Sequence, residues 1–92
     1  MNVSIVIANN QVFPEPATAN KLTEDRVTFH SNDYKYRITF AGASPFPVKT
    51  FVIEAGMNYT YWPRAEASGE YKYNMENLDT GIVVDPTVII KP

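Results

Sequence analysis

Apolar and polar residues alternate one by one along several stretches of this chain, which is the pattern of half-buried β-strands. The clearest stretch covers residues 34–40, where every second side chain is aromatic or aliphatic and the intervening ones are Lys35, Arg37 and Thr39. Shorter stretches repeat the pattern at residues 3–7, 27–30, 51–54, 70–75 and 87–91. The spacing of three to four residues that is typical of amphipathic helices is nearly absent. The pattern therefore predicts an all-β protein.

Turn-forming residues separate these stretches, and their spacing indicates an architecture. The turns fall at residues 31–33, 55–56, 67–69, 79–81 and 85–86. About seven or eight short strands at this spacing are typical of a two-sheet antiparallel sandwich with Greek-key connections. An eight-stranded closed barrel is the alternative.

Length and composition limit the possible functions. The 92 residues fit a single domain, residues 1–92, and the hydrophobic content of 45% is that of a globular protein. The chain has no cysteine, which excludes disulfides, zinc–thiolate sites, iron–sulfur clusters and a cysteine nucleophile. The net charge of −2 gives no electrostatic case for binding nucleic acid or an anionic membrane. We expect neither of these partners, and the sequence leaves the oligomeric state open.

The first residues carry no basic region followed by a long apolar run, so they do not resemble a signal peptide. No apolar stretch approaches the roughly 20 residues that are needed to span a bilayer. As written, the chain is expected in the cytoplasm. A periplasmic or secreted location stays open for the case in which a leader has been removed.

Tyr71 follows a turn that contains Gly69 and stands at the start of a predicted strand. In a β-sandwich, a tyrosine in this position can form a tyrosine corner, in which its hydroxyl bonds to backbone a few residues upstream. We expect this bond near Glu66 or Ala67. The alternative is a large amphipathic core residue whose hydroxyl reaches water.

Three segments of the chain have strand and turn patterns in an order that is found in one family. Residues 27–32, V-T-F-H-S-N, resemble a V-x-F-x-N strand and turn, and residues 69–75, G-E-Y-K-Y-N-M, resemble a G-E-Y-x-F-x-C strand. Residues 81–90 are similar to the final loop and strand of the same proteins. These are the cupredoxins of the plastocyanin and pseudoazurin type, and the resemblance covers most of the chain from Phe13 onward. It implies a cupredoxin-like sandwich.

The resemblance does not extend to the copper ligands. A cupredoxin binds copper through two histidines, a cysteine and usually an axial methionine. The matching positions hold Tyr36, Met75, Leu78 and Ile82, of which only the Met75 thioether is a weak ligand. The resemblance therefore implies a domain without metal, cofactor or electron transfer. We expect these four side chains to converge and to fill the former copper end with packed hydrocarbon.

Other chemistry-bearing residues give no strong catalytic or metal site. His30 is the only imidazole, and a triad with Ser31 and Asp33 is disfavoured because neighbours on a strand point to opposite faces. We expect a surface histidine beside a turn. Three carboxylates near the last hairpin could hold a hard cation weakly, but solvated loop charges are favoured: Glu76, Asp79 and Asp85.

Aromatic residues offer candidate binding surfaces. Alternation places Tyr59 and Tyr61 on one face of a strand and Trp62 on the other, so at least one of these faces is partly outside. Exposed flat rings often bind sugars or peptides. The favoured alternative is that Trp62 is an ordinary core or rim residue before Pro63. Phe46 lies between two prolines, and we expect it on an exposed, stiffened loop tip.

The sequence favours a non-catalytic module that binds another protein, with Phe46, Trp62 and His30 as the candidate surface. A small-molecule or metal carrier that uses the former copper end with altered ligands is the alternative. An enzyme is the least favoured class, because no catalytic cluster or cofactor motif is present in the sequence.

Overall fold

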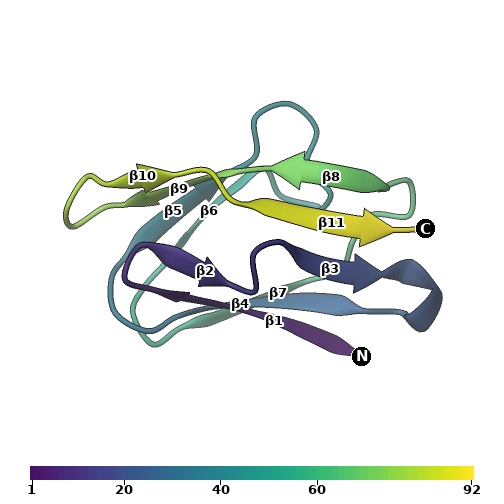
Figure 1. Ribbon diagram of the computed structural model, residues 1–92, viewed down its shortest axis with the longest axis horizontal. Coiled ribbons are helices and arrows are strands. Elements are labelled where there is room, and N and C mark those ends of the chain that lie inside the picture. Colours follow the sequence, from purple (N-terminus) through teal and green to yellow (C-terminus); the bar gives the residue numbers. More distant parts are fainter.

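The computed structural model describes all 92 residues and consists of short strands joined by loops, with one turn of 3-10 helix (Figure 1). The strands are β1 (Asn2–Ala8), β2 (Gln11–Phe13), β3 (Ala17–Asn20), β4 (Arg26–Ser31), β5 (Tyr36–Thr39), β6 (Thr50–Ile53), β7 (Asn58–Tyr61), β8 (Gly69–Lys72), β9 (Asn74–Asn77), β10 (Val83–Val84) and β11 (Thr87–Lys91), and the helical turn η1 is Lys21–Thr23. The predicted all-β class is confirmed. No helix of this fold is long and apolar enough to cross a membrane.

The strands form three sheets, in the orders β2-β1-β4-β7, β10-β9-β5-β6 and β3-β11-β8. Two of the pairs are parallel: β1 runs alongside β4, and β11 runs alongside β3. The prediction of two purely antiparallel sheets is therefore wrong. Alternation along a strand could not have revealed this, because side chains alternate in the same way beside a parallel or an antiparallel neighbour.

There are more strands than predicted because the chain passes from one sheet to another within single runs. The run 70–75 is divided at Tyr73 into β8, which pairs with β11, and β9, which pairs with β5. Opposite this point, Asp85 and Pro86 separate β10 from β11, and the Tyr73 N–H donates to the Pro86 carbonyl at 3.0 Å. Proline has no N–H to continue a ladder. Figure 1 shows the pair β9–β10 and the pair β8–β11 as one long two-stranded ribbon that bends in the middle.

The core contains most of the side chains that alternation predicted to point inward, but not Tyr34, which is 36% exposed. The fully buried apolar residues from these runs are Ile5, Ile7, Val27, Phe29, Tyr36, Ile38, Phe40, Ile53, Met75, Val88 and Ile90. Phe29 lies among three other rings in edge-to-face contact, with ring centroids 5.2 Å away at Phe51, 6.0 Å at Phe46 and 6.1 Å at Tyr73. Such contacts add stability beyond the area that the rings bury.

Phe46 is part of this core and is only 1% exposed, so the prediction of an exposed loop tip is wrong. Its loop is fixed by polar contacts: the Ser44 hydroxyl donates to the Val48 carbonyl at 2.6 Å and accepts from the Phe46 N–H at 3.1 Å. The Arg64 N–H donates to the Pro45 carbonyl at 2.7 Å. The stiffened loop therefore turns its ring inward, and Phe46 is withdrawn as an interaction residue.

Candidate functional site

The end of the molecule at which the resemblance places the copper-ligand positions contains two of the four matching side chains in its interior. Tyr36 on β5 and Met75 on β9 are both fully buried, on strands that pair with each other. Leu78 is half-buried, and Ile82 is 47% exposed. The Ile82 carbonyl accepts from the Asn77 N–H at 2.8 Å, while its side chain stays in solvent. The expectation that all four side chains fill this end is therefore wrong for Ile82.

A hydrogen-bonded network closes this end, where packed hydrocarbon was expected. The Tyr36 hydroxyl donates to Asp33 Oδ1 at 3.0 Å and accepts from the Asn10 N–H at 3.2 Å. Asp33 Oδ2 accepts from the Asn9 N–H at 2.7 Å. The fully buried Asn77 donates its Nδ2 to Asn10 Oδ1 at 2.8 Å. The carboxylate, the amides and the phenol are thus engaged with one another.

Burial raises the pKa of Tyr36 to about 12, and the nearby Asp33 contributes in the same direction. The phenol therefore stays protonated at neutral pH, and a neutral phenol is a poor metal ligand. Asn9 and Asn10 both have left-handed backbone, with φ of 59° and 62°, in the tight turn between β1 and β2. Asparagine tolerates this conformation in two-residue hairpin turns, so the Asn-Asn pair predicts the turn but not its bond to Asn77.

His30 has its own partner and is not joined to Ser31 or Asp33. It lies on β4 opposite Asn58 of β7, and its Nδ1 bonds to the Asn58 side-chain oxygen. The Ser31 hydroxyl donates to the Tyr34 carbonyl at 2.6 Å. The three candidate triad residues therefore make three separate sets of contacts, and His30 is half-buried beside β7.

The three carboxylates of the last hairpin also have separate partners. Glu76 forms an ion pair with Arg37 at 3.2 Å, and Asp85 forms one with Lys72 at 3.5 Å. Asp79 accepts from a backbone N–H at 3.1 Å. No three His, Asp or Glu side chains gather where they could hold a metal ion.

The Tyr71 hydroxyl accepts from the Ser68 N–H at 3.0 Å. The bond goes to upstream backbone, as expected, but its partner lies one residue beyond Ala67 and the phenol is the acceptor. Tyr71 is half-buried. Its ring and this bond hold the turn that contains Gly69, where φ is +98° and a residue with a side chain would be strained.

Trp62 is 52% exposed, while the two tyrosines of the same segment face inward. Tyr59 and Tyr61 pack on Phe51 of β6, and their ring centroids lie 5.7 and 5.1 Å from that of Phe51. On the other face, the Arg26 guanidinium lies 5.7 Å from the centre of the Trp62 ring. The predicted division of these aromatics into an inner and an outer set is confirmed.

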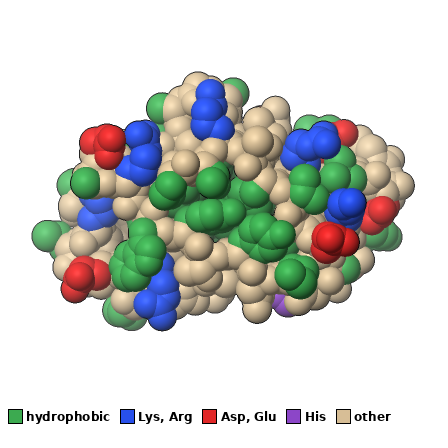
Figure 2. Space-filling view, turned by 180° about the vertical axis from the view of Figure 1, so that it is seen from behind, with side chains coloured by type: hydrophobic (Ala, Val, Ile, Leu, Met, Phe, Trp, Pro, Cys, Tyr) green, Lys and Arg blue, Asp and Glu red, His purple; other side chains and the backbone are tan.

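Figure 2 shows apolar side chains across the middle of the back face of the molecule, with charged side chains toward both ends.

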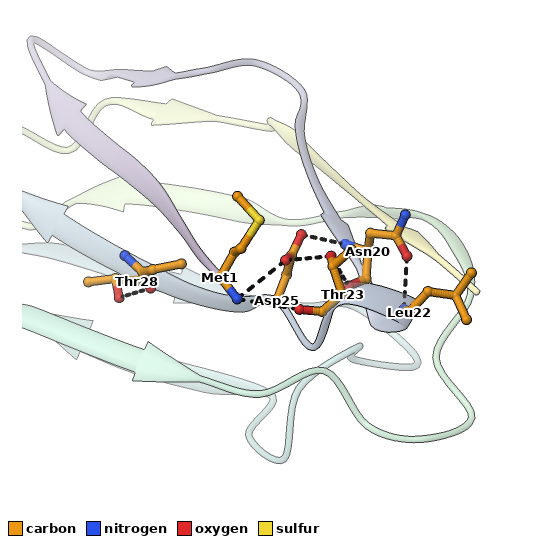
Figure 3. A network of polar contacts seen from close by, with 7 residues as sticks. Met1, Asn20, Leu22, Thr23, Asp25 and Thr28 are labelled. Atoms are coloured by element: carbon orange, nitrogen blue, oxygen red, sulfur yellow. Dashed lines mark hydrogen bonds and ion pairs between the residues drawn. The ribbon is translucent and has the colours of Figure 1, made fainter.

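Leu22 is 83% exposed on η1, in a turn that is held by side-chain hydrogen bonds (Figure 3). Asn20 Oδ1 accepts from the Leu22 N–H at 2.8 Å, and Asp25 Oδ2 accepts from the Asn20 N–H at 3.0 Å. Asp25 Oδ1 accepts from the Thr23 hydroxyl at 2.7 Å. The hydrogen bond from the Asn20 N–H, followed by that from Thr23, holds the pKa of Asp25 below its ordinary value of 3.8. The turn therefore presents Leu22 to solvent from a fixed backbone.

The Leu22 turn and the Trp62 segment lie next to each other. A shallow hollow of about 190 Å³ is lined by Lys21, Glu24 and Asp25 from the turn and by Trp62 and Pro63 from the segment after β7. The Lys21 ammonium donates to the Ala65 carbonyl at 2.7 Å, which ties the two segments together. We call Leu22, Trp62 and this hollow the Leu22–Trp62 surface. The exposed leucine gave no signal in the sequence, because its turn has no strand alternation.

A larger groove of about 440 Å³ lies between β2 and the link from β10 to β11. Its lining residues are Asn10, Gln11, Val12, Phe13, Glu15, Val84, Asp85 and Pro86. They come from two edge strands and from the two proline-containing crossings between sheets, so no single run of sequence marks the groove. No family model, curated protein or solved structure matches the chain.

Proposed function

We propose that this chain is a cupredoxin-like β-sandwich without copper that binds a partner protein through the Leu22–Trp62 surface. The family assignment is supported by the order of the elements: β4 with buried Val27 and Phe29, then β5 with Tyr36, and last β9 with Met75 before the terminal β11. The absence of copper is supported by the residue types at the ligand positions, none of which is a histidine or a cysteine.

The observation that carries the proposal is a large exposed aromatic ring, Trp62, which shares a hollow with the turn that presents the exposed Leu22. Tryptophan and arginine are the residue types that most often dominate protein-binding energy, and Trp62 already has the Arg26 guanidinium against its ring. The Leu22 turn is fixed by Asn20, Thr23 and Asp25. A surface that is ordered before binding loses little conformational entropy when the partner arrives.

The partner chemistry follows from the hollow between the two segments. Trp62 and Pro63 supply the apolar part of the lining, and Lys21, Glu24 and Asp25 add one positive and two negative charges. We therefore expect a partner that presents an apolar side chain with mixed polar residues around it. An apolar centre with a polar rim is the usual composition of a protein interface.

The test compares two variants on the proposed surface with one elsewhere. Trp62→Ala and Leu22→Ala remove the exposed side chains, and Ile82→Ala is the matched control because Ile82 is also exposed but is not part of this surface. Each protein is cross-linked in native extract, and the captured proteins are quantified by mass spectrometry. We expect wild type and Ile82→Ala to capture the same partner protein in similar amounts. Trp62→Ala and Leu22→Ala should each capture at least tenfold less of it.

Folding must be equal for this comparison to hold. Surface substitutions usually change stability by less than about 0.5 kcal/mol, and loss of the Arg26–Trp62 contact adds up to about 1 kcal/mol, so all three variants should remain folded. Urea unfolding followed by circular dichroism checks this. The proposal is wrong if the capture profile of the folded Trp62→Ala protein equals that of wild type, or if only Ile82→Ala changes it.

A small-molecule carrier is the second candidate function, and a different observation favours it. The groove beside β2 is of a size that holds small ligands, and it contains none of the residues of the Leu22–Trp62 surface. The former copper end supports a metal carrier less well, because Tyr36, Asp33 and Asn77 are engaged in hydrogen bonds with protein groups.

A further inference from the structure

We infer that the groove between β2 and the β10–β11 link binds a small organic cation, an ammonium or guanidinium group on a short apolar body. This inference is independent of the Leu22–Trp62 surface, because the two sites share no residue. The volume of the groove, about 440 Å³, lies within the roughly 300–1,000 Å³ of typical small-molecule sites.

The charge of the groove selects a cation. Two carboxylates, Glu15 and Asp85, line it, and no lysine, arginine or histidine does. Glu15 accepts the Thr87 N–H at 3.1 Å with one oxygen, and its second oxygen has no partner in the protein. Asp85 meets Lys72 at 3.5 Å in an ion pair with both side chains exposed, which is a weak interaction in water. Both carboxylates are therefore available to a cationic ligand.

The remaining lining residues suit an apolar body. Val12 and Pro86 are buried and present hydrocarbon to the groove, and Phe13 is 54% exposed beside Glu15. A cation over an aromatic face is attracted by the ring, so Phe13 and the carboxylates favour the same kind of ligand. Gln11 adds an amide at the rim. An anion would meet two like charges here, and Lys72, which is next to the groove, is already paired with Asp85.

Tyr73, whose backbone is bonded to Pro86 of the groove, carries a buried phenol. The Tyr73 hydroxyl is the one buried side-chain polar atom without a hydrogen-bond partner, and its backbone N–H bonds to Pro86 of the groove. Burial raises the pKa of Tyr73, and the Glu15 carboxylate contributes in the same direction.

The test uses three compounds with the same ring and different charge: 2-phenylethylammonium, neutral 2-phenylethanol and anionic 3-phenylpropanoate. Binding is followed by amide chemical shifts of the ¹⁵N-labelled protein. We expect saturable shifts at Gln11, Phe13 and Asp85 with the ammonium compound only, weakened at high salt as for any interaction between exposed charges. Equal binding of the neutral compound, shifts that map elsewhere, or no binding would overturn the inference.

Variants identify the groups that hold the cation. The double variant Glu15→Gln, Asp85→Asn keeps similar shapes and should weaken binding of 2-phenylethylammonium at least tenfold. Glu54→Gln is the matched control, because Glu54 is an exposed carboxylate outside the groove. Unchanged affinity in the double variant, or an equal loss in the control, would overturn the assignment. A capped Gly-Lys-Gly peptide that binds more than tenfold tighter than the free amine would overturn the small-molecule source.

Discussion

Tyr36 and Tyr73 place two phenols in the interior, and their hydroxyl groups are in opposite situations. The Tyr36 hydroxyl makes two hydrogen bonds, to Asp33 and from Asn10. The Tyr73 hydroxyl makes none. A hydrogen bond contributes about 1 kcal/mol net, whereas a buried polar group without a partner costs about 1–3 kcal/mol. The same atom therefore has opposite effects on stability at the two positions.

This contrast gives a prediction for Tyr73→Phe. Removal of the hydroxyl leaves the ring contacts with Phe29 and Phe40 in place and eliminates a polar group that has no partner. We expect the free energy of unfolding to be unchanged or to rise by about 1 kcal/mol. Urea unfolding measures this free energy, and its slope against urea concentration should be the same in the variant and in wild type. Tyr36→Phe is the control and should lower stability by about 1–3 kcal/mol, because it leaves Asp33 and the Asn10 N–H without the phenol. The reverse order of the two variants would contradict the argument.

Among the elements, the loop between β5 and β6 departs most from what its sequence suggested. Two prolines around an aromatic residue indicated a stiff exposed tip, and the stiffness is real, but the ring points inward. Phe46 contacts Phe40 at 5.7 Å and Tyr61 at 6.1 Å between ring centroids. The direction is set by Ser44 and Arg64, and Arg64 is distant in the chain, so a local pattern could not show it.

Phe46→Ala is therefore expected to act as a core substitution. Large-to-small changes of a buried phenylalanine cost about 3–5 kcal/mol, through lost burial and the cavity that remains. Thermal and urea unfolding should both show this loss. The exposed Phe13→Ala is the comparison, and its change should stay within about 0.5 kcal/mol. If Phe46→Ala had the small effect of a surface change, the ring would not be part of the core in solution.

Alternation predicted the inward-facing side chains of β1, β4, β6 and β11 because burial on one face of a sheet imposes a period of two. It could not predict which strands pair, since β1 with β4 and β3 with β11 are parallel contacts between distant segments. The start of β5 was also misplaced: the Ser31 hydroxyl holds Tyr34 in a turn, so the strand begins only at Tyr36. Local pattern gives the faces of strands, and long-range contacts decide their partners.

The candidate sites follow the same division. Alternation placed Trp62 on the face opposite Tyr59 and Tyr61, but it left open which of the two faces is outside, and the structure exposes Trp62. The groove could not be predicted, because Glu15 and Asp85 come together only when β2 and the β10–β11 link lie on facing edges of different sheets. Leu22 was missed because its exposure depends on Asp25, which caps the turn from beyond it.

In the molecule as a whole, polar residues join the sheets at the end that contains Tyr36 and Asn77. The Asn77 side chain at the end of β9 bonds to Asn10 in the turn between β1 and β2, and so connects two sheets. Tyr36 makes a second connection through Asn10 and Asp33. A metal would have to displace these bonds and leave buried polar groups unpaired, which costs free energy. These hydrogen bonds support the proposal that this end holds no metal.

The last prediction concerns copper. The intense blue colour of a cupredoxin requires a thiolate ligand, and this chain has no cysteine. The pKa of Tyr36 is about 12, so its phenol is protonated at neutral pH. Met75 offers only a buried thioether with no imidazole beside it. Addition of one equivalent of Cu(II) at neutral pH should therefore give no intense visible absorption and no tight one-to-one complex at this end, as measured by absorbance and calorimetry. Tight stoichiometric binding that is lost in Tyr36→Phe or Met75→Leu, with both variants still folded, would show that the end holds a metal after all, and the copper-free assignment would fail.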